Sequence, residues 1–378
     1  MTYKRPVEAF PPGEFIRDEL VARGWTQADL AGIVNRTVQH VNLLVTGKKA
    51  VTAQTAYELG AAFGTGPEVW MNLQTAYSLW LEDEPKDEIA ERAHLFQIAP
   101  VKAMLSRGWI APTETLADLK SELTRFYETD DLFHLPPVKI AARANVELTP
   151  EIRAAQVCWV CRVKQLAGLV QAAEFKPETL KTGISRLRKL AAWPEETRKV
   201  PRLLAELGVR FVVVEHLPRS RIDGAAFFVG EFPVIGMSLR FPRIDYFWHT
   251  LMHEVDHILH RDEMTIDVNI NEKPDDPETA SAEIRADHEA ADMLISSAEL
   301  NSFISRVGPL YSKDRINRFA NKLGIHPGII VGQLHYRREI PYSANTEMLV
   351  PVRDIVIAEA LTDGWGKMVA TWTGKGAT

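Results

Sequence analysis

The segment FWHTLMHEVDHILH, residues 247–260, constrains the fold of this 378-residue chain more than any other segment. Its apolar residues recur at helical spacing, and the segment VRFVVVEHL, which indicates a buried strand, precedes it. On a helix, His253 and His257 lie on one face because they are four residues apart, so both imidazoles can reach one ion. The segment therefore predicts a metal-binding helix in a domain that also contains strands.

The residues of this motif supply the groups of a hydrolytic zinc site. Neutral imidazoles suit Zn²⁺, and two of them on one helical turn leave room for a further ligand and a water. Glu254 follows the first histidine and can act as a general base on that water, because the metal lowers the pKa of the water to about 7. The motif therefore predicts a metallopeptidase centre with Glu254 as its catalytic residue.

A third ligand must come from elsewhere in the chain, since two histidines hold a catalytic zinc poorly. The acidic segment SAEIRADHEAADMLISSAEL (281–300) is predicted to be a second helix, on which Glu283 and Asp287 share a face. One of these carboxylates would bind the zinc and the other would orient a ligand. His249 lies one turn before His253, where it could position a substrate, stabilise an oxyanion or cap the helix.

Composition limits the other classes of function. The net charge of −6 argues against a protein that coats nucleic acid by charge alone, so any DNA contact must come from a local patch. The opening residues lack the apolar core of a signal peptide, and no apolar run approaches the roughly 18 residues of a membrane span. The cysteines, Cys158 and Cys161, cannot form a disulfide framework. We therefore expect a cytoplasmic protein that makes no membrane contact.

The sequence pattern divides the chain into three regions. Residues 1–80 have the pattern of short helices with tight joints, in which Thr26 and Thr52 are expected N-caps. Residues 81–199 are mostly helical in pattern and predict a helical connector. In residues 200–378, a predicted β-hairpin around a Gly-Glu turn precedes the two helices described above. The predicted fold class is α+β, mostly α, with a small sheet in the last region.

The segment TQADLAGIVNRTVQHVNLLVTGKK (26–49) has the layout of a helix-turn-helix, whose second helix would enter the major groove of DNA. Amide and hydroxyl groups near the start of that helix can read base edges, and polar or basic groups beside it suit phosphate contact. The predicted base-reading residues are Thr37, Gln39, His40 and Asn42, and the predicted phosphate contacts are Gln27, Arg36, Lys48 and Lys49. A helical bundle used only for dimerisation is the alternative interpretation.

Two further segments of the N-terminal region are distinctive, PGEFIRDELVARGWTQADLA and GTGPEVWMNLQTAYSLW. On these segments, residues 12–80 resemble the HigA family of antitoxin repressors. Members of that family bind operator DNA as dimers and neutralise a partner toxin. The resemblance therefore implies a homodimer whose partners are operator DNA and a cognate toxin.

Residues from about 200 to 340 resemble the ImmA/IrrE family of metallo-endopeptidases. The likeness rests on FWHTLMHEVDHILH, SAEIRADHEAADMLIS and INRFANKLGIHPGIIVGQLHYR. It implies a zincin-like fold in which His253, His257 and Glu283 bind Zn²⁺ and Glu254 is the catalytic base. The middle segment RAHLFQIAPVKAMLSRGWI resembles the connector found where the two kinds of domain are fused.

This chain departs from the ImmA/IrrE pattern at two positions. Asp256 stands where glycine is usual, and Ser296 stands where a proline usually ends the second helix. Neither change removes a ligand, although Asp256 is expected to alter the electrostatics of the site.

Together these features predict a DNA-binding regulator with a zinc-dependent endopeptidase domain that acts on a protein partner or on itself. The alternative is an antitoxin-like repressor whose metallopeptidase fold serves only as a binding or sensing surface. The intact motif with Glu283 favours the first function, because a site that has lost its activity tends to lose its base or a ligand. Fold alone does not decide between the two.

Overall fold

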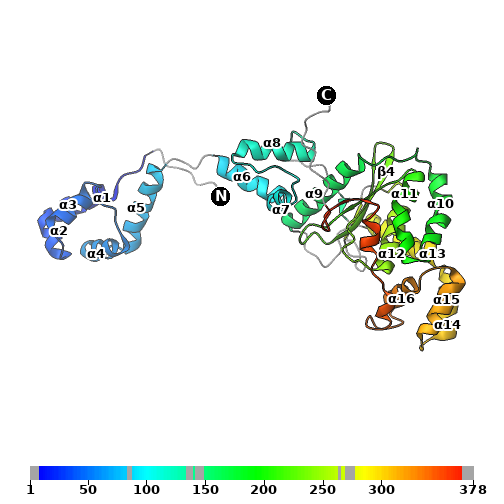
Figure 1. Cartoon of the computed structure of the whole chain (residues 1–378). Helices are drawn as coiled ribbons and strands as arrows, with labels where there is room; N and C mark the ends of the chain where they lie inside the picture. Colours follow the sequence, from blue (N-terminus) through cyan, green and yellow to red (C-terminus); the bar gives the residue numbers. More distant parts are fainter. Residues whose placement is uncertain are drawn as a thin grey trace, which may run out of the picture. The chain divides into compact units, whose positions relative to one another are not determined.

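A computed structural model of the chain contains two compact units, Met1–Ile89 and Ala90–Thr378 (Figure 1). The structure describes residues 8–82, 87–132, 139–140, 149–262, 265–268 and 277–367. Within these residues, no helix combines the length and the apolar character needed to cross a membrane.

The described part of the N-terminal unit is helical. Its helices are α1 (Pro12–Arg23), α2 (Gln27–Ile33), α3 (Val38–Val45), α4 (Ala53–Phe63) and α5 (Pro67–Leu81) (Figure 1). The predicted caps are confirmed, since the Thr26 side chain accepts a hydrogen bond from the backbone N–H of Asp29 and the Thr52 side chain accepts one from Thr55. Helices α2 and α3 therefore form the predicted helix-turn-helix.

One hydrophobic core holds the helices of this unit together. Each helix contributes a buried side chain to it, and these are Ile16, Leu30, Val41, Leu59 and Trp70. Helix α1 approaches the end of α3 at Gly13, where an added Cβ would lie 2.5 Å from the carbonyl oxygen of Leu44. Only glycine fits this approach, so helix α3 is held closely against α1.

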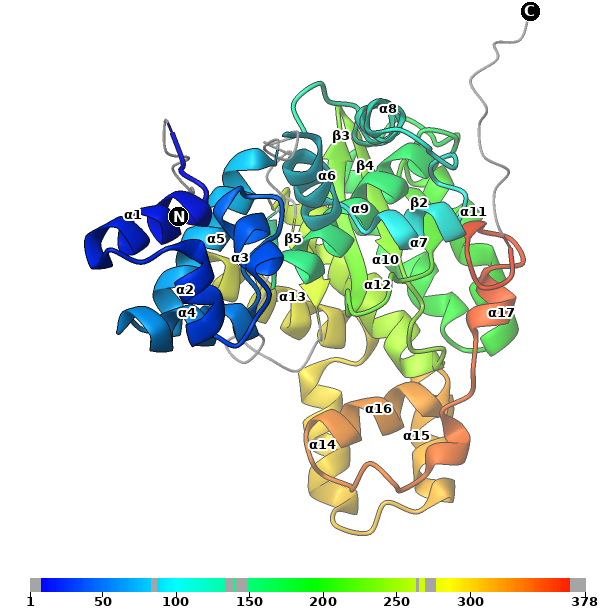
Figure 2. The same cartoon turned by 90° about the vertical axis from the view of Figure 1, so that its left-hand side faces the viewer.

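The second unit combines many helices with one mixed sheet. Its helices are α6 (Asp87–Ile98), α7 (Val101–Ser106), α8 (Leu116–Tyr127), α9 (Pro150–Ala167), α10 (Pro177–Leu190), α11 (Val200–Glu206), α12 (Ile244–His260), α13 (Pro277–Leu294), α14 (Ser297–Val307), α15 (Lys313–Leu323), α16 (Pro327–Tyr336) and α17 (Arg353–Val356). Helices α14, α15 and α16 lie together at one end of the unit (Figures 1 and 2). The predicted class, α+β and mostly α, is confirmed.

The sheet contains the predicted hairpin. Its strands are β1 (Lys139–Ile140), β2 (Arg210–Val214), β3 (Ile222–Val229), β4 (Phe232–Met237), β5 (Thr265–Val268) and β6 (Leu361–Asp363), in the spatial order β1-β5-β3-β4-β2-β6. Strands β3 and β4 are antiparallel and turn at Gly230, whose φ of 61° lies in the left-handed region. Strand β2 runs parallel to both β4 and β6.

Both faces of the sheet are covered, which explains the continuous apolar run of β2. Phe211 and Val213 pack into the same core as helix α12, whereas Val212 and Val214 pack on the other face with helix α9. The indole Nε1 of Trp159 on α9 also donates a hydrogen bond to the carbonyl oxygen of Val214, at 2.8 Å. Helix α9 comes from the region predicted as a connector, so that part of the region belongs to the core of the second unit.

The prediction of one continuous helix over residues 281–300 is wrong. The first helix, α13, ends at Leu294, and α14 begins at Ser297. The side chain of Ser296 accepts a hydrogen bond from the backbone N–H of Glu299, so it caps α14. The Asp292 carboxylate accepts a further bond from the backbone N–H of Ser297, at 2.9 Å. A serine cap thus separates the two helices.

Candidate functional site

Helix α12 carries the motif in the interior of the second unit. His253, Glu254 and His257 are 0%, 1% and 3% exposed, so the motif is not a run of polar residues on a surface helix. The carboxyl group of Glu254 lies against strand β3, where a Cβ added to Gly224 would be 3.0 Å from its Cδ atom. Gly224 therefore provides the space that the Glu254 carboxylate occupies.

Three predicted ligands converge at one point. The Nε2 atoms of His253 and His257 are 3.0 Å apart. Glu283 of α13 places Oε2 3.2 Å from His253 Nε2 and Oε1 3.4 Å from His257 Nε2. Two neutral nitrogen donors and one carboxylate oxygen form a set that suits Zn²⁺ and leaves a position open for a further ligand. The residues present therefore fit a zinc ion.

A carboxylate faces the other ring nitrogen of each histidine. Asp287 Oδ1 lies 3.0 Å from His253 Nδ1, and Asp262 Oδ2 lies 2.8 Å from His257 Nδ1. Carboxylates in this position fix the orientation of a metal-binding imidazole and increase its basicity. Of the two carboxylates left open by the sequence, the geometry thus favours Glu283 as the ligand and Asp287 as the orienting group.

Sequence reasoning missed two members of this arrangement, Arg285 and Asp262. Arg285 of α13 pairs with Asp262, and its Nε also lies 2.9 Å from Asp256 Oδ2. Asp256 is 1% exposed and also lies 3.2 Å from His260 Nδ1. Arg285 therefore bridges two aspartates that flank His257. The sequence signal for this bridge was an arginine two residues after the expected ligand.

The histidines affect the ionisation of the nearby carboxyl groups. Burial disfavours the charged form of Glu283, but its hydrogen bond to His253 and the charges of both histidines outweigh burial and lower its pKa. Burial likewise opposes ionisation of Asp287, while His249 and His253 hold its pKa well below the usual value. The pKa of Asp262 is lowered because His257 and Arg285 outweigh its burial. These groups are therefore carboxylates at neutral pH.

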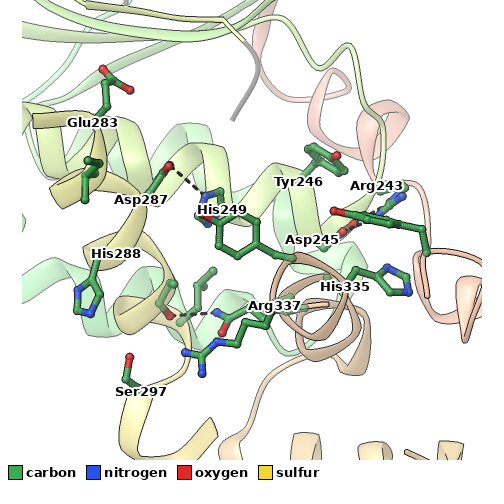
Figure 3. Close-up of a pocket in the computed structure, with 18 residues that line it drawn as sticks. Arg243, Asp245, Tyr246, His249, Glu283, Asp287, His288, Ser297, His335 and Arg337 are labelled. Atoms are coloured by element: carbon green, nitrogen blue, oxygen red, sulfur yellow. Dashed lines mark hydrogen bonds and ion pairs between the residues drawn. The ribbon is translucent and has the colours of Figure 1, made fainter. Parts of the chain in front are cut away.

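A pocket of about 430 Å³ opens beside the cluster. Glu283 and Asp287 line it from α13, and residues of α12 and α16 line its other sides (Figure 3). His249 also lines the pocket, with its Nε2 3.5 Å from Asp287 Oδ1. Of the roles open to His249, a contact with a substrate or an oxyanion fits this place better than a helix cap, since His249 lies within α12 and Arg243 is its N-cap residue.

The N-terminal unit displays a second set of predicted contacts on and around helix α3. Gln39, Asn42, Lys48 and Lys49 are exposed, as a DNA-contacting surface requires. The amide Nδ2 of Asn42 donates a hydrogen bond to Oε1 of Gln27, at 3.2 Å. This bond joins the start of α2 to the face of α3.

The other predicted DNA contacts also interact within the unit. The Thr37 side chain caps α3 by accepting from the His40 N–H, at 3.2 Å. Arg36 pairs with Glu58 of α4, at 2.5 Å, so its charge is already compensated. His40 Nδ1 lies 3.2 Å from Lys49 Nζ, and burial with the charges of Lys49 and Arg36 lowers the pKa of His40. His40 therefore offers a neutral imidazole at pH 7.

Comparison with known proteins relates the N-terminal unit to bacterial regulators. No family model matches the chain. Virulence-associated protein I of Dichelobacter nodosus is 33% identical over 87 residues, which are 23% of this chain and 81% of that protein. YddM, an uncharacterized HTH-type transcriptional regulator of Escherichia coli (strain K12), is 32% identical over 68 residues, which are 18% of this chain and 72% of that protein.

Through its N-terminal unit, the chain belongs to the HTH-type transcriptional regulators. Two solved structures are also similar to it, each with a TM-score of 0.19. One is PA4674 of Pseudomonas aeruginosa in complex with its operator DNA, which is 36% identical and covers 20% of this chain and 82% of that chain. The other is an addiction module antidote protein of a HigA family from Coxiella burnetii, which is 33% identical and covers 20% of this chain and 83% of that chain.

The orienting carboxylates lead to a prediction about metal affinity. Asp262→Asn should weaken zinc binding by about 10- to 100-fold while the capacity of one zinc per chain is kept, because a neutral amide orients His257 less well. Competition with a chromophoric chelator measures this affinity. Asp314→Asn, at an exposed position of α15, is the matched control and should bind zinc like the wild type. Equal affinity of Asp262→Asn and the wild type would contradict the orienting role.

Proposed function

We propose that this regulator binds operator DNA through its N-terminal unit and that its second unit is a zinc-dependent endopeptidase. The substrate of the peptidase would be a protein partner or the chain itself. The observation that carries the proposal is the convergence of His253, His257 and Glu283 beside the buried Glu254, at the edge of an accessible pocket. A surface used only for binding would not require two further carboxylates aimed at the same two imidazoles.

The chain's own residues would divide the work of peptide hydrolysis. His253, His257 and Glu283 would hold the zinc, and Asp287 and Asp262 would keep the imidazoles oriented. When bound, zinc supplies Lewis-acid chemistry that lowers the pKa of water and polarises a peptide carbonyl group. The pocket would hold the substrate segment and exclude water from around it.

Glu254 would carry the proton. It lies between the two histidine ligands in sequence, and Gly224 provides the space for its carboxylate inside the protein. A carboxylate oxygen of Glu254 would take a proton from the attacking water and deliver it to the leaving amine nitrogen. This role needs a proton acceptor at neutral pH, which glutamine cannot be.

Helix α3 would enter the major groove of the operator. Gln39 is exposed in the first turn of that helix, where side chains meet base edges, and Lys48 follows the helix where a phosphate would pass. Two copies of the chain would bind two half-sites about one helical turn apart. The HigA-like sequence of this unit makes a toxin a candidate for the protein partner.

The two DNA-contact roles predict different responses to mutation. Gln39→Ala should lower specific binding by about 1–3 kcal/mol and relax discrimination at one base pair. Lys48→Ala should weaken binding to all sequences. It should also reduce the slope of log affinity against log salt concentration by about one, because one phosphate contact is lost. Binding titrations on promoter and random DNA at several salt concentrations separate these effects, with the exposed Lys181→Ala of the second unit as control. Parallel losses by both variants on both DNAs would refute the division of roles.

Catalysis is tested by Glu254→Gln. Because glutamine is nearly isosteric but accepts no proton, cleavage should fall by about 100- to 10,000-fold while zinc content and operator affinity stay at wild-type values. Cleavage is followed by mass spectrometry of the chain and of a co-expressed toxin candidate, with the exposed Glu174→Gln as the matched control. If zinc, operator affinity and signal-induced expression are all unchanged in Glu254→Gln, the second unit is a binding module and not a protease.

A further inference from the structure

The pocket beside the zinc ligands continues along one face of helix α13. Glu283, Asp287, Ala291 and Leu294 all line it and follow one another at the spacing of successive helical turns. A peptide bond placed at Glu283 would therefore have the rest of this face directly beside it. The pocket is thus continuous with the proposed catalytic centre.

We propose that this pocket is the specificity subsite of the peptidase, and that it receives a large apolar side chain of the substrate with an acidic side chain next to it. The proposal names the substrate class of the centre proposed above and rests on that function for the position of the cleaved bond. Binding in the pocket, however, can be measured without cleavage.

The walls of the pocket favour an apolar occupant. Among the lining residues, Leu294 and Ala291 lie on the α13 side, Ile329 lies on α16, and Tyr246 and Tyr342 contribute aromatic rings. The volume of about 430 Å³ lies within the range of roughly 300–1,000 Å³ of pockets that bind small ligands. It therefore has room for an aromatic side chain, which buries more apolar surface than any aliphatic one.

The charges around the pocket favour an acidic side chain next to the apolar side chain of the substrate. Asp245 is paired with Arg243 at 2.5 Å, and Asp287 lies beside His249 and His253. Arg337, in contrast, has a neutral partner. Its Nη1 donates a hydrogen bond to the amide oxygen of Asn301, at 2.6 Å, and no described acidic side chain pairs with it.

Arg337 lies away from the acidic end of the pocket. Figure 3 shows it well apart from Glu283. Arg337 would therefore attract a carboxylate of the substrate at a point of the pocket away from the proposed zinc ligands. The planar guanidinium group of Arg337 can donate two parallel hydrogen bonds to one substrate carboxylate, which the ammonium group of a lysine cannot do.

The test uses the full-length, zinc-loaded chain carrying Glu254→Gln, so that peptides bind and are not cut. Calorimetry measures its affinity for the blocked tripeptide acetyl-Glu-Phe-Glu-amide. That peptide should bind about tenfold or more tightly than acetyl-Glu-Ala-Glu-amide, because the phenyl ring buries much more apolar surface in the pocket than a methyl group does. It should also bind about tenfold more tightly than acetyl-Gln-Phe-Gln-amide, which cannot pair with Arg337.

Matched variants assign each preference to its residue. Ala291→Phe should abolish the preference for phenylalanine by covering the apolar wall that the substrate ring would contact, while Ala298→Phe, at an exposed position of α14, should not. Arg337→Gln should abolish the preference for the acidic peptide, while Arg338→Gln, at the exposed neighbouring position, should keep it. Circular dichroism confirms that each variant is folded.

The two proposals fail in different ways. Equal affinity for the phenylalanine and alanine peptides, or a preference that survives Ala291→Phe, overturns the subsite whatever the enzyme cleaves. A preference that follows Ala291 and Arg337 supports the subsite. If in addition no zinc-loaded chain with Glu254 intact cleaves these peptides or a protein, the peptidase function falls and the pocket remains a peptide-binding site.

Discussion

The pairing of each motif histidine with a carboxylate at Nδ1 is the interaction on which the arrangement of the second unit's site depends. Asp287 and Asp262 direct the Nε2 atoms of His253 and His257 towards each other and towards Glu283. Without them, the imidazoles of a single helix could rotate away, since nothing in the spacing of four residues fixes the ring orientation. The Nε2 atoms of two buried imidazoles and the oxygens of one carboxylate thus face one another. All of them can donate electron pairs to a metal, so a bound cation would stabilise the arrangement.

The fold supplies this geometry from three directions. The covered sheet fixes α12 in the interior, because the apolar side chains of β2 alternate between two buried faces. Gly224 on β3 provides space for Glu254, while α13 supplies Glu283 and Asp287 from one face. Because the helix breaks at Ser296, α14 is separate from α13. Residues of α16 line the pocket on the side away from α13. The proposed chemistry and the proposed substrate preference therefore depend on the same helix, α13.

Local structure and the convergence of the candidate ligands could be predicted from the sequence, whereas most distant contacts could not. The hairpin, the caps at Thr26 and Thr52 and the convergence of His253 with His257 follow from spacing within short segments. The bridge from Arg285 to Asp262 and the pairing of Arg36 with Glu58 join residues more than 20 positions apart, and no local pattern specifies such pairs. The helix break was missed because serine is tolerated in helices as well as at their ends. The pocket was missed because residues of α12, α13 and α16, which are separated in the sequence, line it together only in the folded chain.

Zinc K-edge X-ray absorption of the purified full-length chain tests the central claim most directly, because it reports the atoms around the metal. The account predicts two imidazole nitrogens at about 2.0–2.1 Å and a carboxylate oxygen at about 2.0–2.2 Å. In Glu283→Gln the carboxylate contribution should weaken while both imidazoles remain. A first shell that contains sulfur at about 2.3 Å, or a single imidazole, would contradict the assignment of His253, His257 and Glu283 as the ligands.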